Sequence, residues 1–477
     1  MYKLGNTALL ISLVVFKLYL FSCNQEQEVQ EMELLDMEAW HTVADQSLLL
    51  EKKDLSNIKW ERNAQFHQIV IDDEEKYQEI DGFGFTLTGG SAMLLHKHLN
   101  EELRDQTLKM IFSREDDGIG VDFLRISIGA SDLDEMVFSY ADHDQDKSLE
   151  NFDLAYDTLY LIPTLKRILE INPNIKIMAS PWSAPAWMKT NHSQIGGKLH
   201  SEHYDTYATY FVKYIQHMEL AGIPIHALTI QNEPEHPGNN PSMLMEATEQ
   251  AEFVKNYLGP TFQYHGIDTK IIIYDHNCDN PQYPITVLND KEAAQYIDGS
   301  AFHMYLGEIE SMTEVRNAHP DKNIYFTEQW TSSNGNFGDD LMWHIDQLII
   351  GGTRNWAKTV LEWNLASDSE QRPYTSDGGC TSCLGALTIS HNAIEKNVAY
   401  YIVGQASKLV PAGSFRIGSS SEQSLPNVAF KTPENEIVLI VLNQNKEQKA
   451  LSVNQKEIQF IIEVEPRSVT TFKWKNQ

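Results

Sequence analysis

The stretch DTYATYFVKYIQHMELAGIPIHALTIQNEP, residues 205–234, contains one complete helix-to-strand unit. Residues 205–221 repeat apolar side chains at helical spacing, and Gly222 ends that pattern. The run 226–231 is short, apolar and β-branched, which indicates a buried strand. Asn232-Glu233-Pro234 follows directly, so polar groups stand at the carboxyl end of this strand. Such a unit, when repeated, builds a parallel sheet covered by helices.

The same alternation recurs between residues 79 and 364, with a second clear helical pattern at residues 154–170. Eight strands are expected, at residues 79–84, 122–127, 176–180, 226–231, 270–275, 299–304, 323–328 and 359–364. Eight strands with intervening helices predict a (β/α)8 TIM barrel, which we assign to residues 79–400.

The pattern changes after about residue 405, where short runs with turn residues between them predict antiparallel strands. These runs are residues 414–420, 427–431, 436–443, 458–463 and 468–473, and residues 437–442 are continuously apolar. Residues 51–78 are expected to add one or more strands to the same unit. The predicted fold is therefore α/β, a TIM barrel with an attached β-sandwich formed from both chain ends, residues 51–78 and 401–477.

The first 23 residues are typical of an export signal. Lys3 precedes an apolar run over residues 8–20, and Ser22-Cys23 follows it, which resembles a bacterial lipoprotein signal with Cys23 as the lipidated residue. An N-terminal membrane anchor, or a signal peptide cut elsewhere, remains an alternative. Residues 24–50 are rich in Glu and Gln and are expected to form a tether. These patterns predict an exported protein, either an outer-membrane lipoprotein or a periplasmic protein.

Composition narrows the class of function. Hydrophobic residues make up 42% of the chain, charged residues 22%, and the net charge is −30, which excludes a nucleic-acid binder because phosphate recognition needs clustered cations. Cys380 and Cys383 form a C-x-x-C pair in a Gly-rich loop. Without a second such pair a zinc site is not expected, which leaves a disulfide or two idle thiols, with Cys278 free.

Polar and aromatic residues follow the predicted strands at their carboxyl ends, where a TIM barrel carries its reactive groups. They include Arg125 and Asp132 after strand two, Trp182 and Trp187 after strand three, Asn232 and Glu233 after strand four, Asp275-His276-Asn277 after strand five, His303 and Tyr305 after strand six, Glu328 after strand seven, and Glu362-Trp363-Asn364 after strand eight.

Two of these residues, Glu233 and Glu328, suit glycoside hydrolysis, which needs one protonated and one ionised carboxyl group. A gap of about 5–5.5 Å between them gives retention of configuration, and about 6.5–9.5 Å gives inversion. Plain structural roles are possible for the neighbours: the tryptophans in the core, Arg125 as a counter-ion of Asp81 or Glu79, and His303 as a buried histidine.

Several motifs together resemble glycoside hydrolase family 30, which includes glucosylceramidases and β-1,6-glucanases. The chain carries them in the family's order: Asp81-Gly82-Phe83-Gly84, Arg125 with Ala130-Ser131-Asp132, the block at residues 179–191, Gln231-Asn232-Glu233-Pro234, His303-Met304-Tyr305, Thr327-Glu328, Glu362-Trp363-Asn364 and residues 407–413.

The resemblance implies a barrel with a β-sandwich, retention of configuration, and no metal or organic cofactor. It implies that Glu233 is the acid/base, that Glu328 is the nucleophile, and that Asn232 binds the sugar 2-hydroxyl. For the remaining positions it implies contacts with the far sugar hydroxyls (Asp132 and Trp182), a wall of the cleaved sugar's subsite (Trp363 and Asn364), and tuning of the carboxylates (Arg125, His303 and Tyr305). The pKa of Glu233 is then expected to rise through loss of water and through the charge of Glu328.

Two departures bear on the substrate. Residues 85–90 replace an acidic turn found in the animal lysosomal members, and the Cys380/Cys383 pair is not a feature of those members. Both loops are expected to shape the aglycone side. β-1,6-Glucan or its oligosaccharides is the favoured substrate, with a glucosylceramidase or broad β-glucosidase as the alternative. A non-catalytic glycan-binding surface lipoprotein is the rival from another class, and a serine hydrolase is excluded because no Gly-x-Ser-x-Gly elbow occurs.

Overall fold

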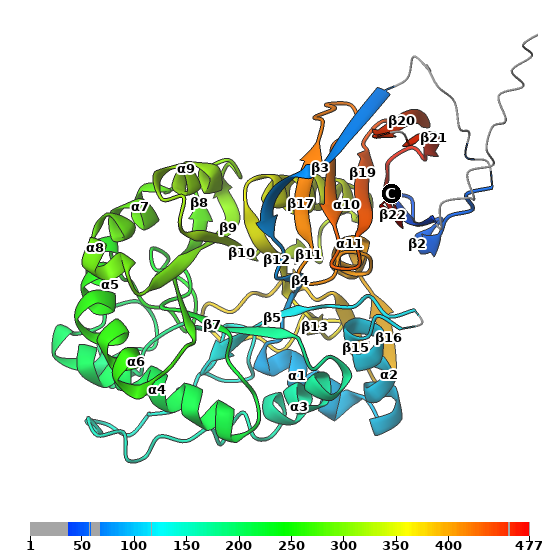
Figure 1. Cartoon of the computed structure of the whole chain (residues 1–477). Coiled ribbons are helices and arrows are strands. Elements are labelled where there is room, and N and C mark those ends of the chain that lie inside the picture. The colour runs from blue at the N-terminus through cyan, green and yellow to red at the C-terminus, as the bar shows by residue number, and fades with distance from the viewer. Residues whose placement is uncertain (1–36, 57, 59–66, 116, 457, 477) are drawn as a thin grey trace, which may run out of the picture.

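The computed structural model describes residues 37–56, 58, 67–115, 117–456 and 458–476, and it contains the two predicted units (Figure 1). The first is a closed barrel of eight parallel strands, in the order β10-β12-β4-β5-β6-β7-β8-β9. The barrel strands are β4 (Gly82–Thr86), β5 (Phe123–Ile128), β6 (Lys176–Pro181), β7 (Ala227–Thr229), β8 (Lys270–Cys278), β9 (Ile297–Gly307), β10 (Asn323–Glu328) and β12 (Ala357–Asn364). The TIM barrel predicted from the sequence is confirmed.

Seven strands each place one side chain in an apolar layer inside the barrel: Phe123, Met178, Ala227, Ile272, Ala301, Tyr325 and Leu361. The eighth strand, β4, approaches its neighbour too closely for a side chain at Gly84. A Cβ there would lie 1.8 Å from the carbonyl oxygen of Phe123, which explains the second glycine of the Asp81-Gly82-Phe83-Gly84 motif. This filled layer makes the barrel a solid support for the rim above it.

Helices cover the outside of the barrel (Figure 1). They are α1 (Gly89–His98), α2 (Glu101–Phe112), α3 (Leu161–Ile171), α4 (Tyr204–Leu220), α5 (Ala247–Phe253), α6 (Gly259–His265), α7 (Gln282–Asn289), α8 (Lys291–Ala294), α9 (Ser311–Ala318), α10 (Phe337–His344) and α11 (Val398–Ser407). The helix expected at residues 154–170 begins only at Leu161. Pro163 explains this, because proline is tolerated in the first turn of a helix but not in its interior.

The second unit is a nine-stranded β-sandwich in the order β2-β1-β22-β19-β18-β17-β3-β20-β21. Its strands are β1 (Glu38–Val43), β2 (Leu49–Lys52), β3 (His67–Glu79), β17 (Phe415–Ser419), β18 (Asn427–Lys431), β19 (Glu436–Asn443), β20 (Lys449–Gln455), β21 (Ile458–Val464) and β22 (Ser468–Lys475). The thirteen-residue strand β3 joins both layers, because residues 67–70 pair with β20 and residues 71–79 pair with β17. β3 then leads directly into β4, the first strand of the barrel.

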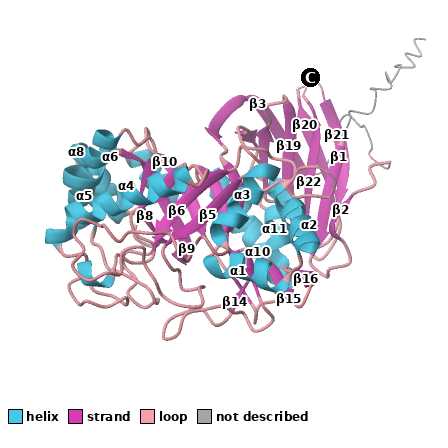
Figure 2. Ribbon diagram, turned by 90° about the horizontal axis from the view of Figure 1, so that it is seen from below, coloured by secondary structure: helices cyan, strands magenta, loops and turns pink. Residues whose placement is uncertain are grey.

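The continuous apolar run of β19 serves two cores. Ile437, Leu439 and Val441 face the interior of the sandwich, whereas Val438, Ile440 and Leu442 pack into the core that includes the barrel and its helices. Alternate side chains of a strand point to opposite faces, so a strand buried on both faces has no polar alternation. Helix α11 fills the junction, since it contacts β4 of the barrel and β1 and β22 of the sandwich (Figure 2).

The start of the sandwich differs from the sequence expectation. Residues 24–50 were expected to form a tether, but residues 38–43 form β1 and β2 begins at Leu49, and β1 pairs with β22 along its length. Strand β20 was not expected at all. Cys23 and the predicted export signal lie outside the described residues. Within the described part of the chain, no helix is long and apolar enough to cross a membrane.

Candidate active site

The predicted polar residues come from several strands and meet at one end of the barrel. Arg125 lies on β5, His303 and Tyr305 on β9, and Glu328 is the last residue of β10. Glu233 follows β7, where its backbone N–H donates to the carbonyl of Asp275 at 3.0 Å. Glu233 has a φ of 47°, a left-handed conformation that is uncommon for a residue with a side chain and is concentrated at functional sites. The backbone thus holds Glu233 in a position it would not adopt freely.

Glu233 and Glu328 face each other across the barrel mouth. One oxygen of each carboxylate and one nitrogen of His303 all lie within 4.8 Å of one another. Both side chains are buried, with only 6% and 5% of their residue surfaces exposed. This closest approach of the two carboxylates is near the gap of about 5–5.5 Å in retaining glycosidases and well below the gap of about 6.5–9.5 Å in inverting ones.

Arg125 is fully buried and fixes several site residues at once. Its guanidinium donates to Oε2 of Glu328 at 2.5 Å, to Oδ1 of Asn232 at 2.6 Å and to Oδ2 of Asp275 at 2.9 Å. Asp81, proposed above as a counter-ion of Arg125, instead binds Lys176 and Lys358. Arg125 therefore orients the nucleophile candidate and Asn232 together.

Asp275 is the central residue that sequence reasoning did not select. Its carboxylate is fully buried and accepts hydrogen bonds from groups on five strands: Arg125, Ser180, Thr229, His303 and Thr327. The charge of Arg125 and the bond from His303 outweigh burial and hold the pKa of Asp275 far below its usual range. Its place at the end of the fifth strand was the available signal, and Asp275 was noted there without a role.

His303 and Tyr305 connect the two carboxylates, as expected. Nδ1 of His303 lies 3.4 Å from Oε1 of Glu233 and 3.7 Å from Oε1 of Glu328. Tyr305 donates its hydroxyl to Oε1 of Glu328 at 2.8 Å. Burial lowers the pKa of His303, but Glu328 and the hydrogen bonds to Asp275 and Glu233 raise it to about 9. The imidazole is therefore charged at neutral pH and interacts with both carboxylates.

The pKa of Glu233 is lowered, which is opposite to the sequence expectation. Burial does raise it, but the hydrogen bond and charge of His303 and the nearby His276 and His236 outweigh that effect. The pKa of Glu328 is raised by burial and by Glu233, against the opposing influence of His303, Arg125 and Tyr305. The expectation failed because it considered only desolvation and the second carboxylate, and left out the charged imidazole between them.

Trp182 and Trp363 stack at 5.3 Å between ring centroids and form one wall of the site. Arg125 lies 4.8 Å from the centroid of the Trp182 ring, a cation–π contact. Only 1% of Trp182 is exposed, so it acts mainly by packing, and its expected sugar contact remains a prediction. Asn364 is held from behind, because its side-chain oxygen accepts from Ser91 at 2.8 Å. Trp187 lies in the barrel core and donates to the carbonyl of Ala141.

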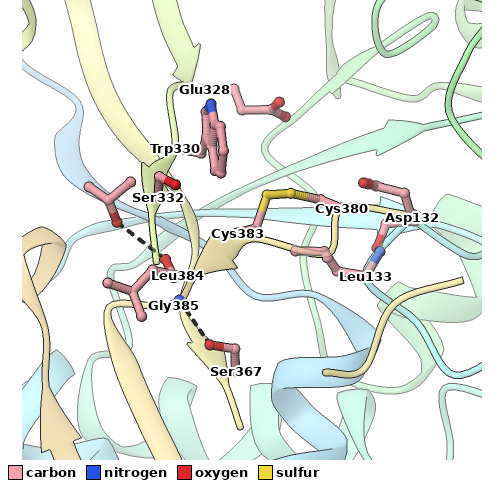
Figure 3. Close-up of a disulfide and its surroundings, with 12 residues drawn as sticks. Asp132, Leu133, Glu328, Trp330, Ser332, Ser367, Cys380, Cys383, Leu384 and Gly385 are labelled. Atoms are coloured by element: carbon pink, nitrogen blue, oxygen red, sulfur yellow. Dashed lines mark hydrogen bonds between the residues drawn. A yellow bond between two sulfur atoms is a disulfide. The ribbon is translucent and has the colours of Figure 1, made fainter. Parts of the chain in front are cut away.

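Asp132 is buried beside the same wall. Burial and the charges of Glu328 and Glu233 raise the pKa of Asp132 to about 8. The Cys380–Cys383 disulfide is present, and Cys383 packs with Leu133, Trp182 and Trp363 (Figure 3). Cys278 is buried and free of a disulfide within the described residues. The disulfide thus contacts the wall that the resemblance assigns to the cleaved sugar, and the expected role of its loop on the aglycone side stays a prediction.

The cluster of Glu233, His303 and Glu328 has donor atoms close enough to hold a metal ion. Its chemistry favours a proton instead. Glu328 already binds the Arg125 guanidinium, and Nε2 of His303 lies 3.1 Å from Oδ1 of Asp275, which keeps the imidazole charged. A charged imidazole is not a metal ligand.

A TIM barrel whose mouth presents two buried carboxylates, an arginine and an aromatic wall defines a glycoside hydrolase. The family model of the glycosyl hydrolase family 30 TIM-barrel domain matches residues 80–410, and that of the family 30 beta sandwich domain matches residues 413–472. The chain belongs to glycosyl hydrolase family 30. It is an enzyme, so the alternative of a non-catalytic glycan-binding protein no longer applies.

Three relatives illustrate the match. The chain is 32% identical over 406 residues to the endo-1,6-beta-D-glucanase neg1 of Aspergillus fumigatus, covering 79% of this chain and 81% of the relative. It is also 32% identical over 406 residues to putative glucosylceramidase 1 of Caenorhabditis elegans, covering 79% and 76%. A solved endo-beta1,6-glucanase structure superposes with a TM-score of 0.86 at 33% identity, covering 93% of this chain and 100% of that one.

Proposed function

We propose that this enzyme hydrolyses β-1,6-glucan or its oligosaccharides with retention of configuration. The separation of Glu233 and Glu328 carries the stereochemical part, since their oxygens lie within 4.8 Å. The substrate part is supported by the endo-1,6-β-glucanases among the relatives, one of which also shares the fold across its whole length.

In this proposal Glu328 is the nucleophile. Its two oxygens are aimed by Arg125 and Tyr305, which hold the carboxylate in one orientation at the barrel axis. An oxygen of Glu328 attacks the anomeric carbon, the glycosidic bond breaks, and a covalent glycosyl-enzyme forms. Asn232 is held by Arg125 at the position from which the family resemblance implies a bond to the sugar 2-hydroxyl.

Glu233 is the acid/base. The raised pKa of His303 favours a proton on its imidazole, whose Nδ1 is 3.4 Å from Oε1 of Glu233. The His303–Glu233 pair thus holds the proton that passes to the leaving oxygen. In the second step Glu233 takes a proton from water as the water oxygen attacks the anomeric carbon. Two displacements at the same carbon restore the original configuration.

A substrate panel tests this function. The purified protein is incubated with β-1,6-, β-1,3- and β-1,4-glucans and with glucosylceramide, and the products are sized and their anomeric form is followed by NMR. We expect β-anomeric oligosaccharides from the β-1,6-glucan alone. Cleavage of glucosylceramide in preference to every glucan would instead support the glucosylceramidase alternative, which other relatives favour. An α-anomeric first product would contradict retention.

We also propose that the protein is exported and anchored through a lipid on Cys23, on the basis of its N-terminal sequence. The anchored form partitions into detergent and has a blocked N-terminus. Cys23→Ala should release the protein from membranes or stop its maturation. A soluble mature form that begins beyond residue 24 would contradict the anchor and leave the enzyme assignment intact.

A further inference from the structure

The Cys380–Cys383 disulfide lies in the loop that closes one side of the active site (Figure 3). It joins residues only three positions apart, with 5.6 Å between their Cα atoms. A disulfide stabilises a fold mainly by restricting the unfolded chain, and this effect is smallest for the shortest loops. This bond therefore adds little to the stability of the whole fold, and its effect is expected on the residues that surround it.

One end of the disulfide is tied to the strand that carries Glu328. Cys383 and Leu384 form β14, which pairs with β11 (Thr331–Ser332), three residues beyond Glu328. The backbone N–H of Ser333 donates to the carbonyl of Ser382 at 2.9 Å, which extends this pairing. Cys383 thus has a fixed position relative to Glu328.

The other end is tied to Asp132. The backbone of Cys380 lies beside Asp132 (Figure 3) and lowers the pKa of its carboxyl group. Within the same loop, the N–H of Thr375 donates to the carbonyl of Asp132 at 2.9 Å. Gly379 permits this approach, because a Cβ there would lie 2.8 Å from that carbonyl oxygen. Asp132 itself is 6% exposed and feels the charges of both Glu233 and Glu328, so its carboxyl group faces the same pocket.

Between these two ends, the disulfide packs against the aromatic wall. Cys383 is buried with Leu133, Trp182 and Trp363, and Cys380, Trp330 and Tyr374 pack against that cluster. Figure 3 shows the sulfur–sulfur bond spanning from the side of Trp330 and Glu328 to that of Leu133 and Asp132. The bond therefore lies between the segment that carries Glu328 and the segment that carries Asp132.

We propose that the Cys380–Cys383 disulfide is a positioning element that fixes Asp132 relative to Glu328 and so sets which sugar the pocket accepts. This inference rests on the proposed function, since it assigns Asp132 to the hydroxyls of the cleaved sugar. Opening the bond releases the loop segment beside Asp132, whereas Glu328 and Arg125 remain bonded to each other. The preference for one sugar over another should then fall more than the rate of hydrolysis does.

The test compares the full-length Cys380→Ser/Cys383→Ser variant with the unaltered protein and with Thr381→Ala. Thr381 is exposed in the same loop, and its replacement keeps the disulfide. kcat and KM are measured on nitrophenyl β-glucoside, on its C4 epimer the β-galactoside, and on the β-xyloside, which lacks the C6 hydroxymethyl group. We expect the glucoside preference in kcat/KM to fall about tenfold in the double variant, mainly through KM, which is the effect of about one lost hydrogen bond. Thr381→Ala should keep the preference.

Two further measurements separate positioning from general stability. Dithiothreitol reduces the bond in the folded protein: it supplies two electrons and two protons, the cysteines become thiols, and the reagent becomes a cyclic disulfide. Reduction should lower the preference of the unaltered protein and leave the double variant unchanged. The pH at which the preference changes should also rise, because the backbone of Cys380 holds the pKa of Asp132 down.

An unchanged sugar preference after both reduction and substitution would overturn the positioning role. So would a loss that is equal for all three sugars, since that is the result of a merely structural bond. Binding of gluco- and galacto-configured iminosugars to Glu328→Gln, with the disulfide intact and opened, gives the same comparison without turnover. If the intact protein hydrolyses no glucan or glucoside, the proposed function fails, whereas hydrolysis with an unaltered preference removes only this inference.

Discussion

Nε2 of His303 lies 3.1 Å from Oδ1 of Asp275, and both side chains are fully buried. Asp275 is not one of the two catalytic carboxylates, yet it compensates the charge of the imidazole that lies between them. The protonation of His303 therefore depends on Asp275, a buried residue that is not itself a catalytic carboxylate.

Asp275→Asn should lower kcat/KM by about 10²-fold, the usual scale for removing one electrostatic contact from an active site. It should also move the alkaline limb of the pH–rate profile to lower pH. The reason is that Asp275 raises the pKa of His303, so without its charge the His303–Glu233 pair loses its proton sooner. Asp298→Asn, which removes a carboxylate from the start of β9, is the matched control and should leave the profile unchanged. An unshifted limb in Asp275→Asn would contradict this role.

Glu328→Gln should reduce kcat by about 10⁴-fold or more without unfolding the protein, since the covalent step loses its nucleophile. The amide keeps the shape and can still accept from Arg125. Azide added to Glu328→Gly should form a glycosyl azide of inverted configuration, because azide attacks from the side that Glu328 occupied. Thermal unfolding checks the fold, and near-normal turnover of the Gln variant would remove the assignment.

Glu233→Ala should affect substrates according to their leaving groups. A poor leaving group needs a proton and a good one does not, so hydrolysis of the glucan should nearly stop. Formation of the glycosyl-enzyme from dinitrophenyl β-glucoside should slow far less. A burst of phenolate should precede slow turnover, and azide should speed the second step with retention. Equal slowing of both substrates, with no effect of azide, would mean that Glu233 only positions the substrate.

Removal of metal ions should leave activity unchanged. The donor atoms of Glu233, His303 and Glu328 lie within 4.8 Å of one another. However, His303 carries a proton and Glu328 is bound to the Arg125 guanidinium, so neither is available as a metal ligand. Rates in EDTA, after dialysis against the chelator, should match untreated rates. Loss of activity that returns with a divalent cation would assign this cluster to a metal.

In the sandwich, Asp73→Asn should lower the free energy of unfolding at pH 7 by about 1.5–3 kcal/mol, the range for hydrogen bonds to charged groups. Asp73 is 2% exposed and binds Lys431, Lys456 and Asn476, which hold its pKa below the usual range. Its contribution is therefore present above the unfolded pKa of about 3.9 and lost as the pH falls below that value. Denaturant unfolding of the variant and of Glu74→Gln, an exposed neighbour, should differ at pH 7, and the difference should shrink as the pH falls from about 3.9 toward the lowered pKa of Asp73 in the folded protein.

The barrel was predictable because each of its strands is a short apolar run ending in polar residues, and this pattern survives in the sequence alone. The start of the sandwich was less so. Residues 38–43 follow an acidic, Gln-rich segment, and their pairing partner, β22, lies more than 400 residues away. Strand β20, with the sequence KALSVNQ, has only Leu451 and Val453 as strongly apolar residues, so its pattern was too weak.

The candidate site was predictable in its members but not in its electrostatics. The sequence shows that Asp275, His276 and Asn277 end the fifth strand, but not which of them points inward. The register of β8 shifts between Tyr274 and His276, and Asp275 has a φ of 63°, so simple alternation of side chains fails there. The charge on His303 depends on the carboxylates of Glu233, Asp275 and Glu328. These residues are far apart in the sequence, so no local sequence pattern predicts their combined effect.

Strand β3 lies near the start of the chain but pairs with strands near its end, which affects the order in which the protein can fold during synthesis. Its partners β17 and β20 begin at Phe415 and Lys449, and β1 pairs with β22, which starts at Ser468. During synthesis β3 must therefore remain without β17 and β20, and β1 without β22, until the C-terminal part of the chain is made, while the complete barrel is already available to fold. A ribosome stalled before residue 415 should carry an assembled barrel with an exposed, unpaired β3, a state in which strand edges are open to aggregation.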